Sequence, residues 1–200
     1  MTHDLLKELE QCLTKVNSPI LKHLDSGTPF DPNHFANMLD LLQLEVSEDL
    51  NTLYMWKPGV KKELINAVDF NIRLFEQGSH IEYTEALQEY QVLVLAELFE
   101  NRYLPFIMMP GLGSEDPTLI DLSKSSKTFG QIFFFSSAML VTKPTSIYDS
   151  LNSMIETILT CHREGVYIFS EEGFLLTDSK KEAKISSRIN KRSVFWKEYF

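Results

Sequence analysis

The spacing of the apolar residues changes near residue 100, and this change most limits the folds open to the chain. Up to about Glu100, apolar residues recur mainly at steps of three and four, the period of an amphipathic helix. Beyond it, short apolar runs alternate with clusters of turn residues, a pattern typical of strands. Helical signals return near the end of the chain. This order predicts an α+β fold, with an antiparallel or mixed sheet of about four to six strands packed against N-terminal, central and C-terminal helices.

Start and stop signals define the helices of the first hundred residues. Asp31 is the expected N-cap of a helix that has Pro32 at its first position. Ser47 is the expected N-cap of a short aromatic helix, which Lys57-Pro58-Gly59 ends. Strict alternation predicts one strand, Val68–Leu74. The predicted helices are Thr2–Val16, the helix that begins at Pro32, Ser47–Trp56, and a helix that Thr84 caps and that runs to about Glu100. This last helix is expected to be central in the fold, because Val92 and Leu95 widen its apolar face.

The second half of the chain is predicted to form strands first and helices afterwards. Short connections between the strands favour antiparallel pairing. Ser146 is the expected cap of a helix that ends at Gly165. The stretch Val166–Thr177 is a possible hairpin, and the Ser179 to Glu182 capping-box spacing starts a terminal helix. The predicted strands are Tyr103–Met109, Thr118–Leu122 and Gly130–Ser136.

Charge and composition narrow the classes of partner. The chain is 44% apolar and contains 14 Phe, which is enough for a packed core. Its net charge is −9, but residues 180–200 carry +5 and the rest carries −14. An acidic body repels nucleic acid and anionic membranes and attracts basic partners. Without a signal peptide or an apolar run of roughly 20 residues, we expect a soluble cytoplasmic protein with no nucleic-acid or membrane partner.

Motifs for catalysis, metals and cofactors are weak throughout. The loop Pro110–Pro117 lacks the Lys-Ser/Thr pair of a phosphate loop and most simply connects two strands. Cys161 and His162 are neighbours on a predicted helix, where side chains point about 100° apart. Cys12 and Cys161 imply no disulfide framework, and the histidines show no zinc-ligand spacing. We expect no catalytic residues, no metal site and no cofactor, although an unrecognised carboxylate pair of a small hydrolase is an open alternative.

The basic terminal segment, Lys184–Phe200, has two interpretations. A basic amphipathic helix can bind a membrane or nucleic acid. Beside an acidic body, however, it is expected to dock on its own domain and bury Ile185, Ile189, Trp196 and Phe200.

The order and spacing of several segments resemble the SUKH superfamily. The segment "VSEDLNTLYMWKPG", Val46–Gly59, is similar to the pattern L-P-x-D-L-x-x-L-Y-x-W-x-N-G of that family. The segment "YLPFIMMPGLGSEDPTLIDL", Tyr103–Leu122, looks like its strand pair, and "GQI" with "SIYDSLNSMIETILTCHREGVY" looks like its later strand and closing helix. The match covers about residues 30–170. It implies a single SUKH-like domain over residues 1–200, with the N-terminal helix and the basic C-terminal helix as extensions.

The resemblance implies a non-enzymatic protein-binding module. Bacterial members of the superfamily are immunity proteins that neutralise a toxin, often a nuclease, encoded by a neighbouring gene; the Smi/Knr members of fungi regulate cell-wall synthesis. The first role predicts a basic toxin as the protein partner, and the second, a regulatory or scaffold role, is the alternative. Tyr54 is expected in the core. The expected partner-binding residues are Trp56, Glu115, Asp116 and Asp121, although Asp121 can equally cap its own strand end.

Overall fold

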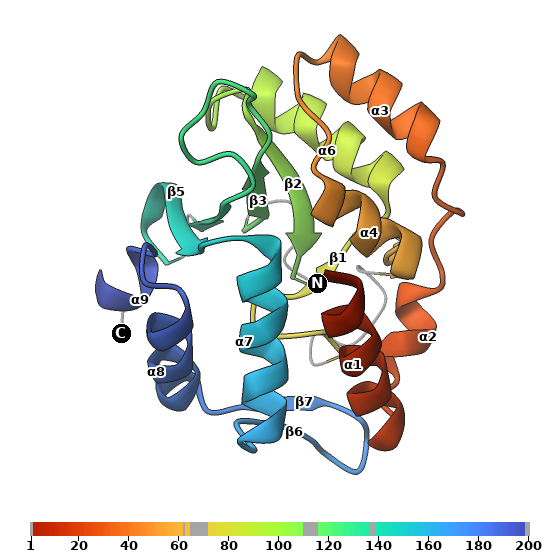
Figure 1. The fold of residues 1–200 in the computed structure, drawn as a ribbon, viewed down its shortest axis with the longest axis vertical. Helices are drawn as coiled ribbons and strands as arrows, with labels where there is room; N and C mark the ends of the chain where they lie inside the picture. Colours follow the sequence, from red (N-terminus) through yellow and green to blue (C-terminus); the bar gives the residue numbers. More distant parts are fainter. Residues whose placement is uncertain (1, 62, 65–71, 110–115, 137–138, 199–200) are drawn as a thin grey trace.

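The computed structural model describes residues 2–61, 63–64, 72–109, 116–136 and 139–198. This part of the chain forms a five-stranded antiparallel sheet, a separate two-stranded hairpin and eight helices (Figure 1). The predicted α+β class is therefore confirmed, with N-terminal, central and C-terminal helices around the sheet.

The five strands lie in the sheet in the order in which they occur in the sequence. Each pairs antiparallel with the next, and for β2, β3 and β4 this is the pairing that their short connections predict. Side chains of residues 132–135 point alternately to the two faces of the sheet. Phe133 and Phe135 pack in a small cluster with Leu119, whereas Ile132 and Phe134 pack in the main core on the other face. The strands are β1 (Ser79–His80), β2 (Tyr103–Met108), β3 (Thr118–Asp121), β4 (Ile132–Ser136) and β5 (Val141–Tyr148).

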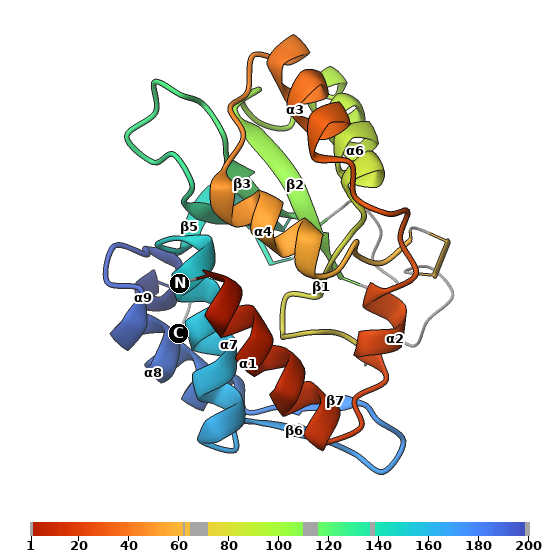
Figure 2. The same ribbon diagram turned by 45° about the vertical axis from the view of Figure 1, so that its right-hand side comes forward.

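Three of the N-terminal helices begin where the sequence predicts, and α2 is a further short helix that it did not predict. Asp31 accepts hydrogen bonds from the backbone N–H groups of Asn33 and His34, and Ser47 accepts one from Leu50. Tyr54 is 1% exposed and packs in the core, as expected. In Figure 2, α3 and α6 lie side by side above α4. The helices of this part are α1 (Thr2–Lys15), α2 (Ile20–Leu24), α3 (Pro32–Leu41), α4 (Glu48–Trp56) and α6 (Tyr83–Leu95).

The helix α6 differs from its prediction at both ends. It begins after Glu82 rather than after Thr84, and it ends at Leu95 rather than near Glu100. Its apolar surface is also only partly buried, because Val92 is 55% exposed and Leu95 is 83% exposed. The predicted strand Val68–Leu74 lies mostly outside the described residues; its last residues lead into a tight turn that the Gly78 N–H closes on the Phe75 carbonyl.

The strand β5 is a finding that the sequence did not predict. Ser146, expected as a helix cap, lies within this strand. The cap of α7 (Leu151–Arg163) is instead Ser150, which forms a capping box with Ser153. Ser146 contacts the C-terminal segment, because its carbonyl accepts hydrogen bonds from the Val194 N–H and the Ser193 hydroxyl.

The C-terminal segment docks on its own domain, as predicted. The hairpin of β6 (Tyr167–Phe169) and β7 (Leu175–Thr177) leads to α8 (Ser179–Ile189), whose cap is Asp178 rather than Ser179. A second short helix, α9 (Phe195–Glu198), follows after a break. Ile185 and Trp196 are each 4% exposed, and the Trp196 indole N–H donates to the Ile147 carbonyl at 2.6 Å. Phe200 lies outside the described residues.

Candidate partner-binding surface

Trp56 ends the aromatic helix α4 and is half-buried. Its indole N–H donates to the Glu10 carboxylate at 3.1 Å, and its ring lies 6.1 Å from that of His80. Lys57 follows and pairs with Glu10 at 3.2 Å and with Asp25 at 3.0 Å. Trp56 therefore joins α4 to α1, and only part of its ring is open to a partner.

The β2–β3 connection holds the next two predicted partner-binding residues. Glu115 lies outside the described residues. Asp116 is 8% exposed, and one of its carboxylate oxygens is buried without a hydrogen-bond partner within the described part of the chain. A buried carboxylate oxygen of this kind is costly unless a donor reaches it. Asp116 thus lies beneath the surface rather than on it.

Asp121, at the end of β3, is fully buried and organises the β3–β4 loop. One carboxylate oxygen accepts from the hydroxyls of Ser126 and Thr128, both at 2.6 Å, and from Arg102 at 3.3 Å. The other oxygen accepts from the Ser123 N–H at 3.0 Å. Charge-assisted bonds of this kind are the strong ones. Asp121 can therefore support a partner surface only through the loop that it holds.

Of the predicted partner-binding residues, the three that the structure describes, Trp56, Asp116 and Asp121, lie on different elements. Asp116 lies in a bend two residues before β3, whereas Asp121 is the last residue of that strand. Trp56 contacts His80 of the edge strand β1, which is two strands away from β3. These residues do not form one recognition patch.

A different feature marks one side of the molecule, and the sequence-based prediction missed it. Residues 23–56 and 74–101 contain twelve Asp or Glu and no Lys or Arg. We call this part the acidic layer; α3, α4 and α6 belong to it and lie together in both views (Figures 1 and 2). The exposed carboxylates of the layer include Asp31, Asp40, Glu48, Glu97 and Glu100.

Two of the cations next to the acidic layer are paired with its carboxylates. Arg102 lies 3.1 Å from Glu100, and Lys124 lies 3.7 Å from Glu45. Because each pair cancels locally, the remaining exposed carboxylates set the sign of the potential over α3 and α6. This sign could have been read from the sequence as a gap in the distribution of Lys and Arg.

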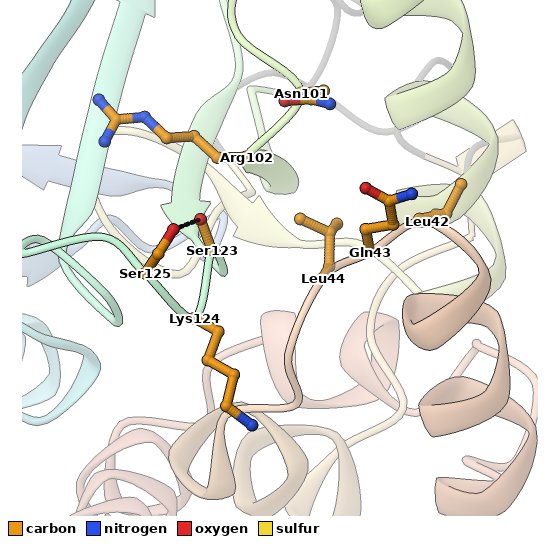
Figure 3. Close-up of a pocket in the computed structure, with 8 residues that line it drawn as sticks. All are labelled: Leu42, Gln43, Leu44, Asn101, Arg102, Ser123, Lys124 and Ser125. Carbon is orange, nitrogen blue, oxygen red and sulfur yellow. Dashed lines mark hydrogen bonds between the residues drawn. The ribbon is translucent and has the colours of Figure 1, made fainter.

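Two adjoining pockets lie where the carboxyl end of α3 meets the β3–β4 loop. One, of about 360 Å³, lies between residues 42–44, 101–102 and 123–125, and the other, of about 560 Å³, runs along α3. Figure 3 shows the amide side chains of Gln43 and Asn101 facing the same space, whereas Arg102 and Lys124 extend away from it in different directions. The pockets share Gln43, Leu44 and Lys124 and so form one groove.

Cys161 and His162 of α7 lie inside the fold rather than in a cleft. Cys161 is fully buried, and burial raises the pKa of its thiol well above the usual range. Burial lowers the pKa of His162 to about 4, and its ring stacks on Phe169 at 5.8 Å. Near neutral pH the thiol is therefore protonated and the imidazole is neutral. Among the residues that the structure describes, no group of three or more His, Cys, Asp or Glu is placed to hold a metal ion.

The sequence was compared with protein-family models and with curated proteins. The chain matches no protein-family model, and no match was found among curated proteins. Within the described ranges, none of the helices is long and apolar enough to cross a membrane.

Proposed function

We propose that this protein is a non-enzymatic binding module of the immunity type, which neutralises a basic bacterial toxin by covering part of its surface. The acidic layer of residues 23–56 and 74–101 is the observation that carries the proposal. Toxins that act on nucleic acid need basic substrate surfaces, and an acidic protein is complementary to such a surface. The sequence resemblance to the SUKH superfamily, with its aromatic helix followed by a strand pair and a closing helix, supports the same role.

Electrostatic attraction of this kind acts mainly on the rate of association. A surface that carries several carboxylates and few free cations raises the on-rate of a basic partner by roughly 10 to 10³ at low salt. The contribution to affinity is smaller, because each charge that becomes buried loses its hydration. Rapid, salt-sensitive association is therefore the kinetic behaviour expected of the proposed complex.

Co-expression with the product of the adjacent gene tests the proposal. We expect that product to arrest growth when it is expressed alone, and this protein to restore growth and form a stable complex with it. A double variant, Asp40→Lys with Glu97→Lys, should lower the on-rate by about tenfold or more at low salt. The matched control, Glu156→Lys with Glu171→Lys, makes the same change in net charge outside the acidic layer and should have little effect.

Two outcomes would contradict the proposal. If the adjacent gene product neither arrests growth nor binds, the immunity role is wrong. If this protein instead binds several partners weakly and neutralises none, the alternative role applies, a regulatory or scaffold module of the same fold in cell-wall synthesis or signalling.

A further inference from the structure

The exposed side of α6 offers a docking surface within the acidic layer. Building on the proposed function, we propose that the partner docks on the apolar stripe of Val92, Leu95 and Leu98, with Gln43 and Glu97 at its rim. The occupant is a basic protein surface that places an apolar side chain on the stripe and Lys or Arg around it.

Val92 and Leu95 lie one turn apart on α6, and Leu98 follows three residues later, after the helix has ended. Val92 is 55% exposed, Leu95 is 83% exposed and Leu98 is 45% exposed. Isolated exposed apolar residues are common, but a continuous strip of large ones is typical of an interaction site. On the neighbouring helix, Leu41 is 76% exposed at the carboxyl end, which lies at the same edge of the molecule (Figures 1 and 2).

Strained backbone at the ends of both helices is the second, independent observation. The Leu44 N–H donates to the Leu39 carbonyl, and the Leu98 N–H donates to the Leu93 carbonyl. This hydrogen-bonded helix ending places Gln43 at φ +59° and Glu97 at φ +54°. Glycine is the usual residue in this conformation, because it lacks the Cβ that makes the conformation unfavourable for other residues.

Both strained residues keep exposed polar side chains next to the stripe and the groove. Gln43 lines both pockets of the groove, and Glu97 lies between Leu95 and Leu98 of the stripe, where the chain leaves α6. Asn17 and Leu140 also have a positive φ, so it is the position of Gln43 and Glu97 beside the groove and the stripe, together with the strain, that points to a function. We infer that these two side chains are kept for contacts with the partner.

Charge complementarity selects a basic protein over a second copy of this chain. The helices α3 and α6 contain no Lys or Arg, and Arg102 and Lys124 at the edge of the groove are paired with Glu100 and Glu45, which leaves exposed carboxylates such as Asp40 and Glu97. A symmetric dimer formed on α6 would bring these carboxylates close to their own copies, and like charges across an interface oppose association. A partner with Lys or Arg around an apolar anchor is complementary to both the apolar stripe and the carboxylates around it.

Titration calorimetry with the purified product of the adjacent gene tests the surface. Leu95→Lys should weaken binding by about 30-fold, the loss typical of a central apolar anchor, and Val92→Lys should act in the same direction. The control Leu176→Lys, at a 47% exposed position on β7 at the other end of the molecule, should bind like the wild type. Because Leu95 is largely exposed, the variant is expected to fold, which circular dichroism verifies.

Glycine variants distinguish the contribution of the two side chains to partner binding from their effect on the stability of the fold. Gln43→Gly and Glu97→Gly should unfold at a temperature a few degrees higher than the wild type, yet bind the partner about tenfold more weakly. Asn17→Gly is the matched control, since Asn17 has φ +50° after α1. It removes a side chain from the same conformation away from the docking surface and should leave binding unchanged.

The possible failures can be told apart. If the wild type does not bind the adjacent gene product, the proposed function fails and this inference fails with it. If the wild type binds and Leu95→Lys binds equally well, only the docking surface is wrong. If sedimentation shows a concentration-dependent dimer of this protein that Leu95→Lys abolishes, the stripe serves a second copy, and the basic partner is the wrong occupant.

Discussion

Replacing Glu182 by glutamine should make the protein less sensitive to pH. Glu182 lies on α8, is 1% exposed, and accepts a hydrogen bond from the Tyr167 hydroxyl at 2.6 Å. Burial raises the pKa of its carboxyl from 4.5 to about 8; the bond from Tyr167 opposes this rise, and the nearby Glu76 carboxylate adds to it. The folded protein therefore holds a proton on Glu182 near neutral pH.

The size and sign of the effect follow from this difference in pKa. Between pH 4.5 and about 8 the native state binds a proton that the unfolded chain has released. The free energy of unfolding consequently falls as the pH rises through this window, and the contribution of Glu182 is fully present only below pH 4.5. At 1.36 kcal/mol per pH unit, and with Glu182 half titrated at pH 8, the loss between pH 5 and pH 8 is about 3–4 kcal/mol.

Urea unfolding followed by tryptophan fluorescence measures the prediction. The introduced glutamine does not titrate, but it keeps a carbonyl that can accept the hydrogen bond from Tyr167. The free energy of unfolding of Glu182→Gln minus that of the wild type should therefore rise by about 3–4 kcal/mol from pH 5 to pH 8. Titrating histidines are common to both proteins and cancel in the difference. Glu156→Gln, at an exposed position on α7, is the control and should show a flat difference. Parallel pH profiles for the wild type and Glu182→Gln would refute the reasoning.

Two further predictions concern other buried groups. His80 is 1% exposed and donates from Nε2 to the Lys57 carbonyl at 3.0 Å, and burial lowers its pKa to about 4. The free energy of unfolding should therefore rise as the pH increases from 4 to 6.5, because in this range the unfolded chain binds a proton that the folded His80 does not. An NMR titration of His80 with a midpoint near 6.5 would contradict this. Asp121→Asn removes the charge from the bonds to Arg102, Ser126 and Thr128 and should lower the free energy of unfolding by about 2–4 kcal/mol. Urea unfolding of this variant, compared with Ser125→Ala, measures the loss.

The starts of α3 and α4 were predictable because their signals are local. Asp31 and Ser47 cap their helices through backbone groups two or three residues away, so the sequence alone contains the whole interaction. Gly165, at φ +67°, follows α7 for the same local reason. The α+β class could be predicted from the change in the spacing of apolar residues near residue 100. That spacing depends only on which residues must be buried, and it can be read directly from the sequence.

The strand β5 was missed because its signal is tertiary. Residues 142–145 are exposed or half-buried, and Pro144 argues against a strand interior. The strand exists as the edge of the sheet, where it pairs with β4 through two register shifts. Nothing local in the sequence indicates such a pairing. Ser146 consequently looked like a helix cap, four residues before the true cap at Ser150.

The candidate site was only partly predictable for a related reason. Apolar residues at helical spacing indicate a face but not whether another element covers it, so Val92 and Leu95 were expected inside the packed face of α6 and are exposed. The partner of Trp56 is Glu10, 46 residues earlier in the chain, which no local pattern reveals. The four bonds that occupy Asp121 likewise depend on the folded loop.

The arrangement of charge determines what a partner meets more than the net charge does. The basic C-terminal segment pairs near itself: Arg188 with Glu164 at 2.9 Å, and Lys181 with Asp178 at 3.1 Å. These carboxylates follow α7 or precede α8 and are not part of the acidic layer. Because charges are screened within about 8 Å at physiological salt, the +5 of residues 180–200 does little to offset the layer at α3 and α6. The net charge of −9 therefore understates the attraction that this side exerts on a basic protein.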